Sequence, residues 1–571
     1  MNPVLALATA AALAVPAVAS AQGDPVMPLS QVQRGMQCSA RSVIHGTDIS
    51  TFDTEVLDVI AGDAADDARI LIRVSGPAVD ETGIGPGFSG SPIYCPDGDG
   101  VQRVIGAISE GIGEYGNKVA LATPIEQMLA EPVSPPSSAR RDPALLRRAH
   151  RLSLPLTISG VSAPIASVIR RVAAGAGRTV LAGPSAPRQA APAAPLVPGS
   201  AFSIGYVSGD LSTGAIGTVA YVDGDQVWGF GHPLDSVGRR DLFLQGAYVY
   251  DIVNNPLGVG DASTYKLAAP TDNVGALLGD GIDAVTGRMG VLPDSFPMTV
   301  FALDQDTGNR VILRSQVADE TSVGNPSGAS PISGIAAVAA GQATYEVLRG
   351  SPARQSGALC RHIAIAERAK PLSFCNTYVG GTPGQAGVVG SPAVSDVSEA
   401  VGILDSYQFE PLHVKSVAID LSARRGLSQA YLVGLTGPHV LHRGRTYRFK
   451  ALLHRVHGAK LTRTLKIHVS RGLHRGFHQL VVRGTPSDTS GGLSDADLSI
   501  ILGFDPGGSS GDDPGPRSIK ALAHAIAGIH RYDGVTADFR GGHGLESRKR
   551  VFRDPNLRVS GTQRYDVIVR R

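Results

Sequence analysis

The sequence has no strong excess of charge of either sign. In its 571 residues, 52 Lys and Arg stand against 50 Asp and Glu, which leaves a formal net charge of +2. Because positive and negative charges nearly cancel, the chain has no global electrostatic field that would favour binding to nucleic acid or to an anionic membrane. Neither is expected as a partner. The length is several times that of a domain of roughly 150 residues, which predicts about three or four domains.

Cysteine is scarce: the chain has four, and no two of them form a C-x-x-C pair. No H-E-x-x-H stretch occurs either, so the sequence predicts no metal site, and it shows no cofactor motif. An even number of cysteines fits an oxidising compartment and permits two disulfides with three connectivities. We expect the pairs Cys38–Cys95 and Cys360–Cys375, with unpaired buried thiols as the alternative.

Long hydrophobic runs are few as well. The run at residues 3–19 ends in small residues before Gln22, a pattern typical of a signal peptide with an A-x-A-type cleavage site. We therefore expect a signal peptide at residues 1–21 and export to the periplasm or the cell exterior. A membrane anchor is the alternative, but the run is shorter than the roughly 20 apolar residues that span a bilayer. No later stretch is long enough, so no stable membrane insertion is expected after cleavage.

Glycine and proline, in contrast, are abundant, with 70 and 38 residues. Together with many short apolar runs bounded by turn residues, they predict a mainly β protein. Shifts in this pattern divide the chain into five expected regions: a signal peptide (1–21), a first β unit (22–130), a Pro/Ala-rich linker (131–198), a second β region (199–394) and a C-terminal antiparallel β-sandwich (395–571).

Few helices are expected among these strands. Residues 123–131 are predicted to form a short helix with Thr123 as its N-cap. Residues 333–350 and 518–532 are predicted to form longer ones. The middle of the linker is expected to add a strand and a short helix.

The sharpest local signal is a serine between glycines, in the string GFSGSP at residues 87–92. On a tight turn such a serine exposes its Oγ, while the backbone N–H groups of Gly87 and Ser89 converge as an oxyanion hole. The nucleophile elbow of α/β-hydrolases is excluded, because Ser91 stands where its second glycine would be and Pro92 with a strand follows in place of a helix. The string indicates the nucleophile loop of a chymotrypsin-like double barrel, and an ordinary turn is the alternative.

A second signal lies in the region that begins at residue 199. Asp223 and Gly224 between two apolar runs predict a β-hairpin, and the string GFGHPL at residues 229–234 ends its second strand. A general base must be held in one tautomer and one orientation, and His232, between a glycine and a proline, is placed for that role. A structural histidine bonded to backbone is the alternative, and His45 in the first β unit is a competing base.

Together the two strings resemble a known family. The segment around residues 87–92 is similar to the serine segment of the SpoIVB-type peptidases, the stage IV sporulation protein B signalling proteases. The segments SIGYVSGD (203–210) and AIGTVAYVDGDQVWGFGHPL (215–234) are similar to that family's histidine segment. The resemblance covers residues 34–130 and 198–300. Here the serine segment precedes the histidine segment, the reverse of the family's order.

The resemblance implies an exported serine endopeptidase with a chymotrypsin-like double β-barrel core, built from the separate segments 22–130 and 199–394. Ser89 would be the nucleophile and His232 the general base. The substrate would be another protein or, through self-processing within the linker, the chain itself. The C-terminal sandwich would then bind a substrate or a surface.

The group that orients the histidine stays open at this point. Asp80, nine residues before Ser89, and Asp235, three residues after His232, are candidates, and a backbone carbonyl is the other option. A rival hypothesis for the whole chain is a non-catalytic secreted or periplasmic binding protein that retains the peptidase fold. The sequence indicates neither the substrate identity nor the oligomeric state.

Overall fold

The structure, a computed structural model, describes residues 23–571 apart from several internal segments. The segments outside the description are 63–66, 131–137, 139, 142–143, 146–148, 153–155, 176–179, 184, 186–194, 257–263, 326–331, 381–391, 485–514, 530–532, 542–543 and 546–548. The predicted signal peptide at 1–21 also lies outside the described residues. Strands account for 54% and helices for 13% of the structure, which confirms a mainly β fold.

Six strands near the N-terminus close into a barrel. Each pairs with two neighbours, and the circuit returns to its start because β1 pairs with both β4 and β2. Around the barrel the strands are β1 (Gln37–His45), β4 (Pro92–Pro96), β5 (Gln102–Gly111), β6 (Val119–Pro124), β3 (Arg69–Ser75) and β2 (Asp48–Ala61). Two short strands attach at its edges: β7 (Arg140–Arg141) on β2 and β8 (His150–Arg151) on β5. We call this unit the first barrel.

The core of the first barrel follows from the two-residue period of its strands. In β3, for example, Ile70, Ile72 and Val74 are fully buried, while the side chains between them point outwards. The predicted disulfide Cys38–Cys95 is confirmed and ties β1 to β4. It closes a loop with a sequence separation of 57 residues, so the chain-entropy model gives it about 4 kcal/mol of stabilisation.

A second circuit of six strands lies beside the first barrel. Its pairs run from β11 through β12, β13, β16, β15 and β14 back to β11. The strands are β11 (Ala201–Gly209), β12 (Ser212–Asp223), β13 (Gln226–Gly229), β16 (Val285–Met289), β15 (Tyr265–Asp280) and β14 (Gly238–Val253). The predicted hairpin is confirmed: Asp223 pairs with Gln226, and Gly224 takes a φ of +60°. We call this circuit the second ring.

The second ring is part of a 13-stranded sheet. On one side β12 pairs with β9 (Leu156–Ser159), which pairs in parallel with β10 (Val180–Gly183) through helix α3 (Ala163–Gly175). These elements supply the strand and helix expected in the middle of the linker. On the other side β11 leads to β18 (Arg310–Ala318), β17 (Ser295–Asp304), β21 (Val414–Arg425), β19 (Gln355–Ile365) and β20 (Leu372–Gly380).

Helices cover this part of the sheet and share one apolar core with it. They are α4 (Ile332–Val347), α5 (Pro392–Asp405) and α7 (Ile519–Gly528). Helices α4 and α7 confirm the two longer helix predictions, and the Ser518 side chain caps α7 by accepting from the Ala521 amide. Short 3₁₀ turns lie at Leu29–Gln31 and Glu320–Val323. The disulfide Cys360–Cys375, also confirmed, joins the neighbouring strands β19 and β20.

Strand pairing crosses the boundary expected at residues 394 and 395. Strand β21 pairs with β17 and β19, and α7 packs against β20, so parts of the chain beyond 395 belong to the central sheet. The expected boundary is wrong because it is placed at a local change in the sequence pattern, and such a change does not show which distant strands pair. The C-terminal sheets start only at β22 (Gln429–Thr436).

The C-terminal unit consists of two sheets around a shared apolar core. One sheet contains β22, β24 (Thr446–Arg455), β25 (Lys460–His468) and β30 (Arg558–Ser560). The other contains β23 (Val440–His442), β26 (Gly476–Arg483), β27 (Gly534–Gly541), β28 (Gly544–Leu545), β29 (Lys549–Arg553) and β31 (Thr562–Arg570). The expected purely antiparallel pairing is wrong for two pairs, because β22–β30 and β23–β31 are parallel.

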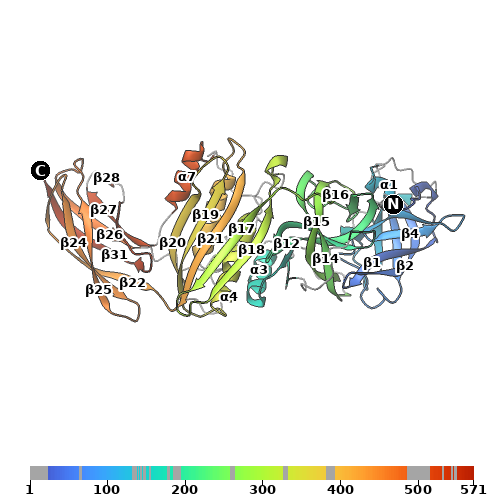
Figure 1. The fold of residues 1–571 in the computed structure, drawn as a ribbon, viewed down its shortest axis with the longest axis horizontal. Helices are drawn as coiled ribbons and strands as arrows, with labels where there is room; N and C mark the ends of the chain where they lie inside the picture. The colour runs from blue at the N-terminus through green and yellow to red at the C-terminus, as the bar shows by residue number, and fades with distance from the viewer. Residues whose placement is uncertain are drawn as a thin grey trace, which may run out of the picture.

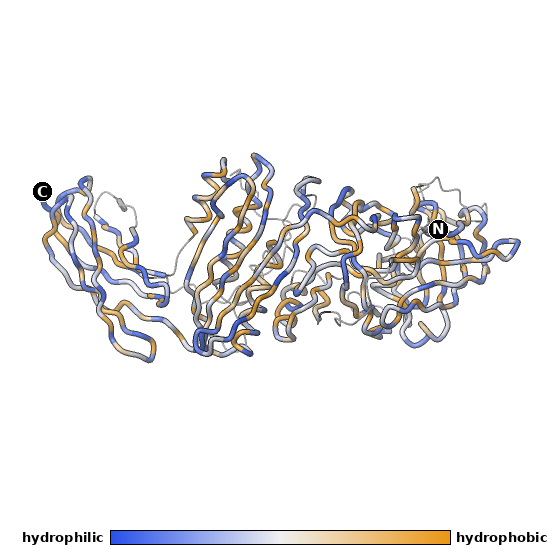
Figure 2. The backbone as a smooth tube through the Cα atoms, viewed as in Figure 1, coloured by the Kyte–Doolittle hydropathy of each residue, from blue (hydrophilic) through white to orange (hydrophobic). Residues whose placement is uncertain are grey.

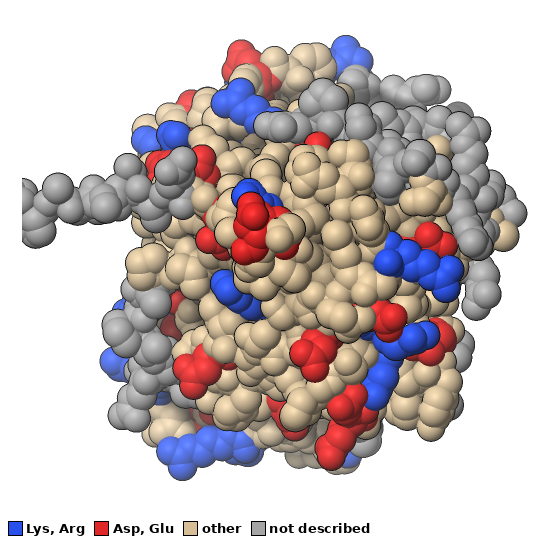
Figure 3. All heavy atoms as spheres, turned by 90° about the vertical axis from the view of Figure 1, so that its right-hand side faces the viewer, with Lys and Arg blue, Asp and Glu red and all other residues tan. Residues whose placement is uncertain are grey.

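The units follow one another along an elongated molecule, with the first barrel at one end and the C-terminal sheets at the other (Figure 1). Hydrophobic and hydrophilic positions alternate along many strands, with hydrophilic residues at several hairpin turns (Figure 2). On the end of the molecule at the first barrel, acidic and basic side chains are intermixed in small groups (Figure 3). Among the described helices, none combines the length and the apolar character needed to cross a membrane.

Candidate functional site

The serine loop, residues 85–91, lies where the first barrel meets the second ring. Gly87 and Gly90 both adopt left-handed backbone conformations, with φ of +93° and +91°. A Cβ on Gly87 would lie 2.8 Å from the Cβ of Lys266, and a Cβ on Gly90 would overlap the carbonyl oxygen of Thr218. Both glycines are therefore required by backbone conformation and by close contact with the second ring.

The carbonyl groups of residues 86–89 in this loop are all engaged. Their donors are the Lys266 amide to Pro86 O (2.9 Å), the Thr218 hydroxyl to Gly87 O (2.8 Å), the Ser91 hydroxyl to Phe88 O (2.6 Å) and the Thr218 amide to Ser89 O (2.8 Å). Three of these four donors come from β12 and β15 of the second ring. The loop is thus held in shape mainly by residues far away in sequence.

The N–H groups of the same four peptide groups divide into two pairs: Phe88 N donates to Gly85 O at 2.9 Å and Gly90 N to Ile108 O at 2.7 Å, whereas the other two are not engaged by any described residue. Within the described part of the chain, the backbone N–H groups of Gly87 and Ser89 donate to no acceptor. Unpaired backbone donors are rare in proteins, so two of them in one short loop indicate a prepared anion site. They are the two amides that the sequence predicted as an oxyanion hole.

The hydroxyl of Ser89 belongs to the same arrangement. Its side chain is fully buried, and its Oγ has no hydrogen-bond partner among the described residues. A buried hydroxyl without a partner is costly, so it marks either strain or a functional role.

The histidine loop approaches from the second ring. After β13 the chain makes a sharp turn in which Phe230 and Gly231 both have positive φ, +66° and +69°. The Gly231 carbonyl accepts a 2.7 Å hydrogen bond from the Thr123 hydroxyl of the first barrel. The predicted N-cap role of Thr123 is therefore wrong: helix α1 (Ile125–Met128) has Pro124 at its N-cap, and the threonine hydroxyl joins the two units instead.

The imidazole of His232 is held in one tautomer. Its Nδ1 lies 2.8 Å from the carbonyl oxygen of Pro233, and because a carbonyl only accepts, Nδ1 carries the proton. The lone pair of the neutral ring is therefore on Nε2, the state required of a general base. The ring is 3% exposed and stacks against Phe230 at a centroid distance of 5.7 Å.

One strand connects the two predicted catalytic loops. In β12, the amide of Thr218 donates to Ser89 O at 2.8 Å, and the carbonyl of Thr218 accepts from the Phe230 amide at 3.5 Å. Ser89 and the residue two positions before His232 therefore share one neighbour. The structure brings the serine and histidine strings together although Ser89 and His232 are 143 positions apart in the sequence.

The two candidate acids are engaged elsewhere. Asp80 is half-exposed and pairs with Lys118 at 2.9 Å, and this hydrogen bond holds the pKa of the Asp80 carboxyl below its usual value. Asp235 accepts from the Tyr206 hydroxyl (2.8 Å) and from the Arg240 guanidinium (2.9 Å). Neither carboxylate bonds to the histidine, so of the three options left open by the sequence, the backbone carbonyl is the one seen in the structure.

The competing base lies apart from the serine loop. His45 is exposed, and its Nδ1 is 2.9 Å from the Tyr250 carbonyl. It is a surface histidine bonded to backbone.

Sequence reasoning missed a lysine beneath the serine loop. Lys266 of β15 is 1% exposed; its Nζ donates to the Ser42 hydroxyl at 2.7 Å and to the Thr218 hydroxyl at 3.0 Å. Burial lowers the pKa of the Lys266 ammonium to about 7. Nothing in the local sequence distinguishes this lysine from a surface one, apart from its place on the inward face of an alternating strand.

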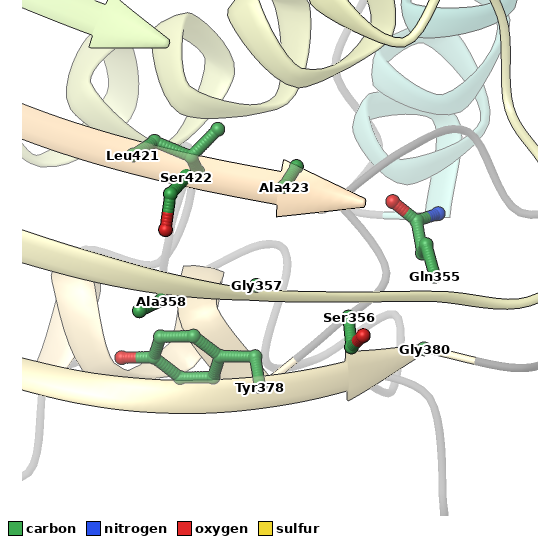
Figure 4. A pocket seen from close by; sticks show the side chains of 9 residues that line it. All are labelled: Gln355, Ser356, Gly357, Ala358, Tyr378, Gly380, Leu421, Ser422 and Ala423. Atoms are coloured by element: carbon green, nitrogen blue, oxygen red, sulfur yellow. The ribbon is translucent and has the colours of Figure 1, made fainter. Parts of the chain in front are cut away.

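A pocket elsewhere in the molecule is separate from this site. It lies on β19, β20 and β21 of the central sheet (Figure 4), away from the first barrel (Figure 1). Its lining residues are Gln355, Ser356, Gly357, Ala358, Tyr378, Gly380, Leu421, Ser422 and Ala423. These side chains include no carboxylate, histidine or cysteine. Across the described ranges, no three His, Cys, Asp or Glu side chains gather as a metal site would require.

Comparisons with protein-family models, with curated proteins and with solved structures find no match to this chain. Any assignment of function therefore depends on the residues and geometry of the site itself.

Proposed function

We propose that this chain is an exported serine endopeptidase of the SpoIVB type, in which the first barrel and the second ring form a chymotrypsin-like pair. One observation carries the proposal. The carbonyls of residues 86–89 are engaged, whereas the hydroxyl of Ser89 and the amides of Gly87 and Ser89 donate to nothing within the described residues. A nucleophile and its oxyanion hole need this combination.

The proposed mechanism assigns one role to each of these groups. Ser89 Oγ attacks the carbonyl carbon of a peptide bond while its proton passes to Nε2 of His232. The amides of Gly87 and Ser89 bind the oxyanion that develops on the former carbonyl oxygen. His232 then gives the proton to the departing amine, which leaves an acyl group on Ser89. Water attacks this ester by the same route in reverse and releases the second product.

Because a carbonyl and not a carboxylate orients the imidazole of His232, the proton transfer from Ser89 to this ring is affected. The Pro233 oxygen fixes the imidazole ring as an aspartate would, but it carries no full negative charge. It therefore stabilises the imidazolium that forms during attack less strongly than a carboxylate does. A slow peptidase, suited to limited cleavage of a protein or to self-processing in the 131–198 linker, fits this arrangement better than a digestive enzyme.

The two disulfides support export, because such bonds persist in oxidising compartments. Burial of Ser89 and His232 describes a site closed to solvent. A substrate segment must therefore displace part of the surrounding surface before it reaches the serine.

A serine-reactive probe tests the proposal directly. The mature protein is treated with a fluorophosphonate and analysed by peptide mass spectrometry, next to the variants Ser89→Ala and His232→Ala. We expect one adduct on Ser89 in the wild type, none in Ser89→Ala, and a loss of at least about 1000-fold in labelling rate in His232→Ala. His45→Ala, a change of the same kind at an exposed histidine, is the control and keeps the wild-type rate.

The non-catalytic binding protein is the second candidate, and the full burial of Ser89 is the observation that favours it. A folded wild-type protein that forms no adduct would overturn the peptidase proposal and support this alternative. Equal labelling of wild type and His232→Ala would overturn the role of the histidine.

A further inference from the structure

Lys266 extends from the second ring into the contact with the first barrel. Its Nζ reaches the hydroxyls of Ser42 on β1 (2.7 Å) and Thr218 on β12 (3.0 Å), and lies 4.6 Å from the centre of the Phe88 ring. Its aliphatic stem packs on Gly87, with carbon atoms 2.8 to 3.1 Å from where a Cβ would stand. The side chain is therefore in contact with both units and with the serine loop.

The amine has no acidic partner to explain its burial. Among the described residues no carboxylate forms an ion pair with Lys266, and the groups facing its Nζ are two hydroxyls and an aromatic ring. Burying an amine in this way is costly, and an apolar side chain of similar length would fill the space more cheaply. The physical reason that remains for a lysine at this position is that its amine donates hydrogen bonds that an apolar side chain could not make.

The two hydrogen bonds of the amine lead to peptide groups of the serine loop. The Thr218 hydroxyl that accepts from Nζ donates to Gly87 O. Independently of the amine, the backbone amide of Lys266 donates to Pro86 O. A third route passes from Nζ through the Ser42 hydroxyl to that of Ser91, 3.0 Å away, which donates to Phe88 O at 2.6 Å.

Two of these three carbonyls belong to the peptide groups of the oxyanion hole. The Pro86 carbonyl and the Gly87 N–H lie in one planar peptide group, and the Phe88 carbonyl and the Ser89 N–H lie in another. Anchoring a carbonyl on one side of the plane fixes the direction of the N–H on the other. It also polarises the peptide group, which makes the N–H a stronger donor.

We propose that Lys266 is a positioning residue for the oxyanion hole. Its backbone amide holds the peptide group of the Gly87 N–H, and its amine, through Ser42 and Ser91, holds the peptide group of the Ser89 N–H. Through Thr218 the amine also fixes Gly87 O, which belongs to the peptide group between these two, so that both N–H groups point at the reacting oxygen. This inference rests on the proposed peptidase function and assigns part of that site to the second ring. Lys266 itself does not touch the substrate.

The hydrogen-bond arrangement holds in both charge states of the lysine. The single protons of Ser91 and Thr218 are used on carbonyls, so the bond to Thr218 must be donated by Nζ. A neutral amine keeps two N–H donors and still makes it. The lowered pKa of Lys266 thus leaves the positioning intact across neutral pH.

Inactivation kinetics with the fluorophosphonate test the proposal in the full-length mature protein. Lys266→Met removes the amine and keeps an unbranched stem on Gly87. Thr218→Val removes the hydroxyl that reaches Gly87 O, and Thr218→Ser restores it. We expect the maximal rate of inactivation to fall about 10- to 100-fold in Lys266→Met and in Thr218→Val, with an unchanged half-saturating probe concentration, and to return to within about threefold of wild type in Thr218→Ser.

The outcomes separate the two proposals. A wild type that labels on Ser89, with Lys266→Met and Thr218→Val at the same maximal rate, overturns the positioning role and leaves the peptidase standing. A wild type that does not label overturns the peptidase proposal and the positioning role with it. If Lys266→Met does not fold, the Thr218 pair decides alone: a loss in the valine variant without recovery in the serine variant counts against hydrogen bonding as the cause.

Discussion

The first barrel and the second ring are built from the same number of strands, yet they contribute to the site in different ways. The first barrel is closed and carries a disulfide, and it supplies the serine loop. The second ring continues into the central sheet and supplies the histidine together with the groups that hold the serine loop. Ser89, the proposed nucleophile, thus belongs to one unit, while its loop is held in shape by hydrogen bonds from the other.

The hydrogen bonds of the serine loop show how the contributions of the two units differ. From the first barrel, the loop receives the Ile108 carbonyl as acceptor for the Gly90 amide at 2.7 Å. From the second ring it receives three donors on its carbonyls, two from Thr218 and one from Lys266. The contact between the units, more than either unit alone, should therefore determine reactivity at Ser89.

The largest effect is expected from breaking this contact at Gly90. An alanine at position 90 would overlap the Thr218 carbonyl and be forced into a φ of +91°. We expect Gly90→Ala to lower the labelling rate of Ser89 by at least about 100-fold and the free energy of unfolding by about 2 to 4 kcal/mol.

Gly100→Ala is the matched control for that experiment. Gly100 has a φ of +82° in an open turn of the same barrel, with no atom within 4 Å of where its Cβ would stand. It should lose about 1 kcal/mol from backbone strain alone and label normally. Equal labelling rates in the two variants would refute the importance of the contact.

The two disulfides provide a smaller test of the same comparison. Replacing Cys38 and Cys95 by alanine should lower the free energy of unfolding by about 4 kcal/mol. It should also slow the labelling of Ser89, because Cys95 lies on β4, the strand that begins directly after the serine loop. Replacing Cys360 and Cys375, which close a 15-residue separation, should cost about 3 kcal/mol and leave labelling unchanged. Denaturant unfolding and probe kinetics measure both. If labelling of Ser89 were slower only in the variant that lacks Cys360 and Cys375, the serine loop would depend on the central sheet and not on the disulfide of the first barrel.

The pH dependence of the free energy of unfolding tests the burial of Lys266 in the second ring. Burial lowers the pKa of Lys266 from 10.5 to about 7. Between these values the unfolded chain binds the proton and the folded one does not, so stability increases as the pH rises through this window. The free energy of unfolding of wild type, relative to Lys266→Met, should grow by about 1 to 3 kcal/mol from pH 7 to pH 9. A difference that stays constant or shrinks would show that the lysine is not buried as described.

The smallest effects are expected at the two acids. Asp235→Asn and Asp80→Asn should change the labelling rate by less than about threefold, because Nδ1 of His232 is bonded to Pro233. Loss of an orienting aspartate in a complete triad costs about 10⁴-fold. A 100-fold loss in either variant would identify that carboxylate as the orienting group and remove the carbonyl from that role.

Features that depend on neighbours in sequence were predictable. The hairpin at Asp223 and Gly224, the two longer helices and the mainly β character follow from local turn chemistry and periodicity. The cysteine pairs were also correct, helped by the small number of combinations that four residues allow. Both site strings came from glycine patterns that require special backbone conformations, and the structure shows those conformations at Gly87, Gly90 and Gly231.

The remaining features depend on which distant segments meet. Thr123 has the residue type and spacing of an N-cap, but its hydroxyl donates to Gly231 O, 108 positions away. Lys266 looks like any strand lysine until β15 is placed against the serine loop. Strand β21 lies beyond the expected boundary because it pairs with β17, more than 100 residues earlier. No local pattern in a single sequence contains this information.

Under the proposed function, the division of the site between the two units sets an order of events during export. The first barrel would leave the export channel before the second ring, and it contains every strand of its circuit and both cysteines of its disulfide. Thr218, His232 and Lys266 follow Ser89 by 129, 143 and 177 positions, so the serine loop lacks all three until the second ring has emerged. A nascent chain with a finished first barrel would therefore be inactive, and the proposed peptidase would become active only after the second ring has docked.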